Sequence, residues 1–235
     1  MQSGLRIDLH VHTARSHDCL SDPAAVVRAA MAAGLDRVCI TDHNALDTAL
    51  RLRDRHPALV IPGEEVRTAE GVDIIGLFLS EPIPKSTPAR ETCERIRAQG
   101  GVVYVPHPFA PGKGGGGRIL AVIADLVDAV ETFNARLHDP ALNARAEAWA
   151  AERELPGGGG SDAHTLREIG RAWVEVPALE DGPTGLIAAL KQGRVHGRES
   201  SRAVHLASTW AKLAKRIGGR VSRDGGRVSR DEGPG

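Results

Sequence analysis

The chain of 235 residues has few cysteines and no long apolar run. Cys19, Cys39 and Cys93 leave an odd count and form no Cys-x-x-Cys pair, so the sequence supports neither a disulfide framework nor a cysteine-rich zinc module. No apolar run approaches the roughly eighteen residues that cross a bilayer, and residues 1–4 lack the charged and apolar regions of a signal peptide. We therefore expect a cytoplasmic protein with no membrane partner.

Neither sign of charge is in excess, because 30 Lys and Arg stand against 30 Asp and Glu. Residues 1–197 nevertheless hold 21 basic and 26 acidic side chains, whereas residues 198–235 hold nine and four. The seven aromatic rings form no ladder on which single-stranded bases could stack. The sequence thus indicates an acidic body with a basic C-terminal segment.

Short apolar runs alternate with amphipathic, alanine-rich stretches along most of the chain. This alternation is typical of repeated βα units and predicts an α/β protein with a parallel sheet, closed as a barrel. Strands are expected at residues 5–9, 37–40, 59–62, 72–79, 102–105, 129–132 and 172–176. Helices are expected at residues 22–33, 45–55, 88–99, 119–127 and 141–154.

The predicted barrel domain covers residues 1–200, followed by a helix at 201–217. Residues 218–235 are predicted to be a disordered Gly/Arg-rich tail, because they hold a perfect seven-residue duplication, too short for a solenoid, and little that could be buried. A glycine run at 157–160 occupies a place where a strand is expected. Its backbone either packs tightly against a neighbour or forms a weak strand.

Histidines and acidic residues gather where the predicted strands end. His10 and His12 alternate along the first strand, so both imidazoles point to the same side and can reach one metal ion. In a parallel barrel all carboxyl ends of strands converge on one face. The other side chains expected at that face are Asp42, His43, Glu64, His107, Asp162 and His164. Alone, each is an ordinary buried residue, but together they indicate a metal site.

Five motifs, in this order along the chain, resemble those of the polymerase and histidinol phosphatase (PHP) family of metal-dependent phosphoesterases. They are Asp8-Leu9-His10-Val11-His12-Thr13, Ile40-Thr41-Asp42-His43-Asn44, Pro62-Gly63-Glu64-Glu65, Val105-Pro106-His107-Pro108 and Ser161-Asp162-Ala163-His164-Thr165. The resemblance implies a distorted (β/α)7 barrel. It also implies two or three divalent ions at the carboxyl face of the sheet, of which manganese, iron and zinc suit mixed imidazole and carboxylate ligands.

The resemblance also implies which residues bind the ions. One ion would bind His10, His12, Glu64 and Asp162, and a third would bind Asp18, His43 and His164. Glu64 would bridge the first ion to a second, which also uses His107. His107 and Asp162 are expected to be the catalytic residues.

Three neighbouring positions have less direct support. The family's usual spacing from the second histidine selects His17, whereas counting back from Pro23, which opens the first helix, selects Asp18; we prefer Asp18 and keep His17 as its neighbour or substitute. Asn134 stands where some relatives supply a further ligand, and its neutral amide is a poorer ligand than histidine. Asp42 is expected to orient a neighbouring group.

Charge points to the class of substrate. Three divalent ions would exceed the charge of Asp18, Glu64 and Asp162, so the site would be a positive hole suited to phosphate. Three guanidinium groups that follow strand ends are candidates to hold phosphate in bidentate fashion: Arg67, Arg118 and Arg136.

The predicted function is a metal-dependent phosphoesterase, with a phosphomonoesterase acting on a small nucleotide or sugar-like phosphate through a metal-bridging hydroxide as the leading hypothesis. Two alternatives stay open. One is a 3′ exonuclease acting on oligonucleotide ends, and the other is a non-catalytic PHP module tethered to nucleic acid by the basic tail. A small phosphorylated partner is favoured over nucleic acid.

Overall fold

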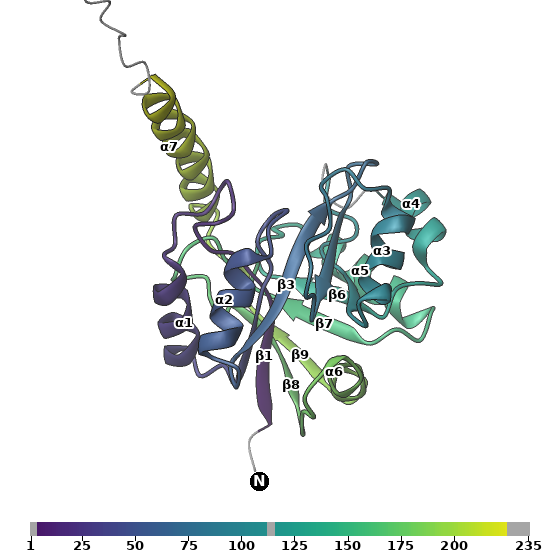
Figure 1. Ribbon diagram of the computed structural model, residues 1–235. Helices are drawn as coiled ribbons and strands as arrows, with labels where there is room; N and C mark the ends of the chain where they lie inside the picture. Colours follow the sequence, from purple (N-terminus) through teal and green to yellow (C-terminus); the bar gives the residue numbers. More distant parts are fainter. Residues whose placement is uncertain (1–3, 112–115, 225–235) are drawn as a thin grey trace, which may run out of the picture.

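A computed structural model describes residues 4–111 and 116–224 of the chain (Figure 1). The described residues form a single sheet of nine strands. Its members are β1 (Leu5–Val11), β2 (Arg37–Ile40), β3 (Val60–Arg67), β4 (Asp73–Leu77), β5 (Val102–Val105), β6 (Ala129–Asn134), β7 (Gly157–Gly160), β8 (Ala172–Val176) and β9 (Arg194–Gly197).

Seven helices connect or follow these strands in the described part of the chain. They are α1 (Pro23–Ala32), α2 (Asp47–Arg55), α3 (Ala89–Ala98), α4 (Gly116–Ile123), α5 (Pro140–Ala151), α6 (Pro183–Leu190) and α7 (Val204–Asp224). The first of them begins as predicted: the Asp22 carboxylate accepts a hydrogen bond from the Ala25 N–H at 2.9 Å, and Pro23 occupies the first turn.

The sheet has the order β7-β6-β5-β4-β3-β2-β1-β8-β9 and curls until its ends approach each other. A parallel bridge between Val11 and Ala163 joins the end of β1 to the segment after β7, so the barrel is nearly closed at that end. The strands from β1 to β3 run parallel, as do β5 to β7, but β4 is antiparallel to both its neighbours. The predicted α/β barrel is confirmed, although the sheet is mixed rather than wholly parallel.

Two apolar cores lie on the two faces of this sheet. The inner core contains inward side chains such as Leu9, Ile61 and Tyr104, together with Leu186 from α6. The outer core packs helices against the strands and contains residues such as Val26 and Ile96. Burial of these side chains, at about 25 cal/mol per Å² of apolar surface, provides the main drive for folding.

All seven strands predicted from apolar runs are present, β7 lies where a strand was expected at the glycine run, and β9 is additional. The glycine run forms β7, and its backbone lies against the barrel interior. A Cβ atom on Gly158 would stand 2.6 Å from the Tyr104 ring and 2.7 Å from Leu9. A Cβ atom on Gly160 would stand 2.6 Å from the Cβ of His10. Glycine is therefore required at β7 because of close approach.

Helix α7 projects from the barrel (Figure 1). It starts at Val204 and continues to Asp224, seven residues beyond the predicted end of the helix. A Gly-Gly pair weakens a helix by about 1 kcal/mol per residue but need not end it. Residues 225–235, the rest of the predicted tail, lie outside the described residues.

The inner face of α7 is anchored to the barrel, and its outer face is open. Ala211 is buried, and the Lys215 ammonium donates to the backbone carbonyls of Ala14 and Ser16. Four large apolar side chains on the helix are exposed: Leu206, Trp210, Leu213 and Ile217. No helix within the described ranges combines the length and hydrophobicity needed to cross a membrane.

Substitution Gly158→Ala is expected to lower the free energy of unfolding by about 1–3 kcal/mol, because the new methyl group must displace Tyr104 or Leu9 in a packed interior. The matched control is Gly117→Ala in α4, where a Cβ meets nothing within 4 Å; this change should be neutral or stabilising by up to about 1 kcal/mol. Urea denaturation of both variants measures the difference. Equal stabilities would contradict the close packing of β7.

Candidate metal centre

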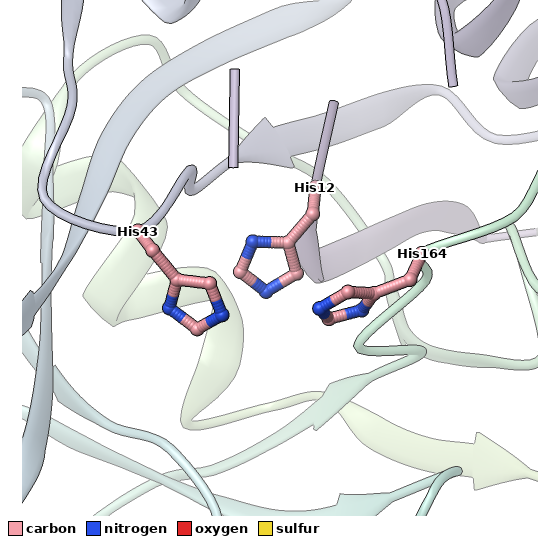
Figure 2. Close-up of side chains that lie close together, drawn as sticks. All are labelled: His12, His43 and His164. Carbon is pink, nitrogen blue, oxygen red and sulfur yellow. The ribbon is translucent and has the colours of Figure 1, made fainter. Parts of the chain in front are cut away.

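Six elements bring imidazoles and carboxylates together at one end of the barrel. Figure 2 shows three of these side chains, His12, His43 and His164, with their rings turned toward one another. In four groups the possible ligand atoms lie within 4.8 Å of one another: His12, His43 and His164; His10, Glu65 and His107; His10, His12 and Asp162; and His17, Asp18 and His43. The side chains of the first three groups are buried or nearly so, so their charges are not screened by solvent, whereas His17 in the fourth group is exposed.

The two histidines of the first motif face each other through their Nε2 atoms, which are 3.0 Å apart. Nδ1 of His10 lies 3.0 Å from Oε1 of Glu131, to which it donates. If both imidazoles were neutral and protonated on Nδ1, the lone pairs of their Nε2 atoms would point at each other and repel. A proton or a metal ion must therefore lie between the two Nε2 atoms. The site therefore requires positive charge at this point.

A hydrogen-bonded chain fixes the tautomer of His12. The Ser16 hydroxyl donates to Oδ1 of Asp42 at 2.6 Å and accepts from the backbone N–H of His43 at 3.0 Å. Since its single proton is used, it can only accept from Nδ1 of His12, 3.1 Å away. Asp42 also accepts from the backbone and the hydroxyl of Thr13, each at 2.7 Å. Asp42 thus orients its neighbours, as predicted, and leaves Nε2 of His12 as a metal-binding atom.

Glu65 is the carboxylate at the centre of the cluster. Its Oε2 atom is 2.8 Å from Nδ1 of His43 and 3.4 Å from Nε2 of His12, and its Oε1 atom is 3.1 Å from Nε2 of His107. Burial would raise the pKa of Glu65, but His43 and His10 hold it well below its usual range. Glu65 therefore stands where a carboxylate bridging two ions would lie.

Glu64, the bridging ligand expected from the sequence, lies outside the cluster, and the adjacent Glu65 lies in its place. Oε2 of Glu64 instead accepts from the Ile83 N–H at 2.9 Å, and burial raises the pKa of Glu64 to about 7. Successive side chains of a strand point to opposite faces. Ile61 in β3 belongs to the inner core and Val60 to the outer core, so odd-numbered residues of β3 face inward. The side chain of Glu65 shares that face, and the side chain of Glu64 does not.

Asp18, rather than His17, joins the buried cluster. Oδ1 of Asp18 is 3.2 Å from Nε2 of His164 and 3.5 Å from Nε2 of His43. The side chain of His17 is 64% exposed and lies 3.7 Å from the outer oxygen of Asp18. Burial would raise the pKa of Asp18, but the neighbouring imidazoles of His164 and His43 hold it far below its usual range.

Two buried carboxylate oxygens in this cluster, Oδ1 of Asp18 and Oε2 of Glu65, accept no well-directed hydrogen bond, although imidazole nitrogens lie close to both. Unpaired buried oxygens cost several kcal/mol unless a cation meets them. Burial would lower the pKa of His43, but charge from Glu65 and Asp18 raises it to about 10, so a proton on His43 can supply part of the positive charge that these oxygens require. The donor set fits divalent ions that accept both nitrogen and oxygen ligands.

The predicted catalytic residues both lie in the cluster. Oδ1 of Asp162 is 3.3 Å from Nε2 of His12 and 3.6 Å from Nε2 of His10. His107 and Asp162 have positive φ angles of 28° and 50°, which non-glycine residues adopt at a cost. Their backbone is therefore held in place by its surroundings, and the His107 N–H donates to Oε2 of Glu131 at 2.7 Å.

Glu131 was missed by the sequence reasoning, and Asn134 has another use. The Asn134 side-chain amide donates to Oε2 of Glu131 at 2.8 Å and lies 3.4 Å from Oδ2 of Asp162. Glu131 thus connects the His10 ring, the His107 backbone and Asn134. The available signal was a charged residue in the middle of an otherwise buried strand, which requires partners.

The three arginines predicted to bind substrate lie in different environments. Arg136 is buried: its guanidinium donates to Ser208 Oγ at 2.7 Å and to the Asp162 carbonyl at 3.4 Å, and it lies 3.3 Å from Glu168. It serves the structure, because its donors are directed at protein atoms. Arg118 is exposed on α4, with no contact recorded to the cluster among the described residues. Arg67 lines a cavity beside Asp18.

Comparison with known proteins identifies relatives of this chain. The family profile described as the PHP domain matches residues 8–80, and the PHP-associated profile matches residues 140–195. MJ1587 of Methanocaldococcus jannaschii, an uncharacterised protein, is 38% identical over 153 residues, which cover 59% of this chain and 87% of that protein. MJ0417 of the same organism, also uncharacterised, is 34% identical over 191 residues, which cover 74% and 72%.

Three solved structures share the fold. PsfC from Pseudomonas syringae PB-5123 has a TM-score of 0.64 and 20% identity, covering 92% of this chain and 99% of that one. A candidate metal-dependent phosphoesterase from Bifidobacterium adolescentis has a TM-score of 0.55 and 19% identity, covering 80% and 96%. An amidohydrolase from Chromobacterium violaceum, with bound sulfate and no metal, has a TM-score of 0.54 and 18% identity, covering 86% and 96%.

The match to the PHP domain covers the strand ends that carry His10, His12, His43 and Glu65. Together with the buried cluster of imidazoles and carboxylates, it supports a metal-dependent hydrolase. The identity with MJ1587 extends over most of that protein. The chain belongs to the PHP family.

Proposed function

We propose that this protein is a metal-dependent phosphoesterase that hydrolyses phosphomonoesters of small nucleotide-like or sugar-like compounds. The observation that carries the proposal is the opposed pair of Nε2 atoms on His10 and His12, beside buried carboxylate oxygens that accept no well-directed hydrogen bond. Such a site is built for cations at the bottom of a polar opening, where the oxygens of a phosphate would be the natural further ligands.

Two or three ions of manganese, iron or zinc are proposed to share the cluster. His10, His12 and Asp162 would hold one, and His10, Glu65 and His107 are grouped around the position of a second. Asp18, His43 and His164 would hold a third, since Oδ1 of Asp18 lies between the two rings. Ions bound there would lower the pKa of bound water and neutralise charge on the phosphoryl oxygens.

The hydroxyl and thiol groups around the cluster are committed to other contacts. The hydroxyl groups of Ser16 and Thr13 both donate hydrogen bonds to the carboxylate of Asp42. The Cys19 thiol is buried, its pKa is raised by burial to about 11, and it faces the carbonyls of His12 and His164. A nucleophile needs a base that takes its proton. Water is therefore the proposed nucleophile.

His107 and Asp162 are proposed to act beside the reacting phosphate. The Asn134 amide at 3.4 Å and the backbone geometry around the positive φ angle hold Asp162 in place. Glu65 holds Nε2 of His107, and Glu131 holds its backbone. These contacts fix both side chains before substrate arrives, which is what positioning of ligands for hydrolysis requires.

Assay of the manganese-loaded protein against phosphomonoesters, cyclic nucleotides and short oligonucleotides tests the proposed function. We expect release of inorganic phosphate from one or more small monoesters, and loss of that activity after chelation. Turnover of oligonucleotide ends in preference to every small monoester would contradict the proposed substrate class. Activity that survives exhaustive chelation would contradict the metal-dependent chemistry.

The variants Glu65→Gln and Glu64→Gln form a matched pair on one strand. Glu65→Gln is expected to lose at least one metal equivalent and to lower kcat by two or more orders of magnitude, because Glu65 contacts three of the ligand histidines. Glu64→Gln should keep its metal, since that carboxylate faces the Ile83 backbone. Elemental analysis after gel filtration measures both. The opposite pattern would restore Glu64 as the ligand.

Hydrolysis in oxygen-18 water should place one heavy oxygen in each released phosphate, because the hydroxyls and the thiol near the cluster are committed and water must attack phosphorus. Mass spectrometry of the phosphate from a single turnover distinguishes the routes. If the first turnover released unlabelled phosphate, or if a phosphorylated side chain were trapped by acid quench, attack by water would be excluded.

A further inference from the structure

A cavity of about 280 Å³ opens at the outer edge of the metal centre. Among the cluster residues it touches Asp18 and His43, and the inner ligands do not line it. Three basic side chains, Arg67, Lys85 and Lys212, also line the cavity, together with His17 and Asn44. The cavity thus lies on the solvent side of the cluster, next to the position proposed for the third ion.

The three cations come from separate parts of the chain. Arg67 ends β3, Lys85 lies between β4 and α3, and Lys212 lies on α7. Arg67 is also paired with Asp73, at 2.8 Å from Nε to Oδ1, and it lines the cavity alongside Lys85 and Lys212. With Asp18 as the only carboxylate in the described wall, the cavity carries net positive charge before any metal binds.

Lys212 is held at the cavity by the anchoring of α7. One residue earlier, Ala211 is buried, and Lys215, one turn further, donates to the backbone of Ala14 and Ser16. Ser208, one turn before, accepts from Arg136 at 2.7 Å. These contacts fix the helix face that carries Lys212, whose Nζ atom lies 3.5 Å from the outer oxygen of Asp18.

We propose that Arg67, Lys85 and Lys212 bind a second anionic group of the substrate, a carboxylate or a second phosphate, while the ester phosphate lies on the metal centre. The proposal rests on the proposed phosphoesterase function. A cavity of this size is at the lower limit for small-molecule pockets, so it suits a small charged group. Cations converging from three segments provide the complementary charge that such a group requires.

The position of the cavity indicates that the anion bound there is a second group of the substrate and not the ester phosphate itself. The reacting phosphate must reach the inner ligands, His10, Glu65 and His107, which the cavity does not touch. An anion in the cavity would instead lie beside Asp18 and His43, one ligand layer further out. The substrate class that follows is a small monoester with two anionic ends.

The test compares two substrates that differ in one group. Glycerol 3-phosphate and 3-phosphoglycerate differ by a hydroxymethyl in place of a carboxylate, and 1,3-propanediol bisphosphate supplies a second phosphate. The manganese-loaded wild type should show a higher kcat/KM for at least one of the two bis-anionic compounds than for glycerol 3-phosphate. Which of them is preferred distinguishes a carboxylate from a phosphate.

In Lys212→Gln and Lys85→Gln, that preference should fall about three- to tenfold, with most of the loss in KM, as expected for a partly exposed charged contact. The matched control is Arg216→Gln, an exposed residue on the same helix that does not line the cavity, which should keep the wild-type ratio. Manganese content is measured for every variant, since Lys212 lies near Asp18.

Calorimetric titration of the chelator-treated protein with 3-phosphoglycerate and the bisphosphate provides a readout that needs no turnover. Binding that weakens in Lys212→Gln and not in Arg216→Gln would support the anion site even if no ester were hydrolysed. Hydrolysis of glycerol 3-phosphate with no preference for either bis-anionic compound, and equal ratios in all variants, would overturn the anion site while leaving the phosphoesterase function intact.

Discussion

Positive charge placed between Nε2 of His10 and Nε2 of His12 is the requirement on which the rest of the structure depends. These atoms lie 3.0 Å apart in a buried site, surrounded by the carboxylates of Glu65 and Asp162. Burial excludes the water that would otherwise solvate them, so a proton or a metal ion must compensate. Much of the surrounding polar structure keeps this arrangement from relaxing: Glu131 fixes one ring, and the Asp42–Ser16 pair fixes the other.

The backbone accepts strain to bring these groups together. His107 and Asp162 adopt positive φ angles, each at a cost of about 1–3 kcal/mol, and the pairing of β1 with β2 shifts register between Asp8 and Val11. Glycine removes a further obstacle, because any side chain on Gly160 would collide with Glu131 and His10. The strained backbone of His107 and Asp162 thus lies at the proposed metal centre, and regular pairing and apolar packing elsewhere in the barrel compensate for its cost.

The sequence predicted the strands and most of the side chains that gather at the end of the barrel, because apolar runs, histidines and strand ends are local signals. Prediction from the sequence failed where the position of a side chain depends on which face of a strand it occupies, or on contacts with residues far away in the chain. Glu64 and Glu65 are adjacent and chemically identical, and the inward direction of β3 decides between them. Lys212 lies on a helix whose sequence contains nothing that identifies the cavity, so only the anchoring of α7 places its ammonium beside Asp18.

Arg136 and Lys212 show how packing divides the work of basic residues near an anionic centre. The planar guanidinium of Arg136 has several donors, and Ser208, the Asp162 carbonyl and Glu168 all lie close to it. Arg136 therefore joins α7 to the segment after β7 that carries Asp162. Lys212 offers a compact charge on a flexible stem, stays half exposed, and meets one carboxylate oxygen at 3.5 Å. A buried arginine therefore fixes the helix, and the exposed lysine that it positions keeps the capacity to bind a ligand.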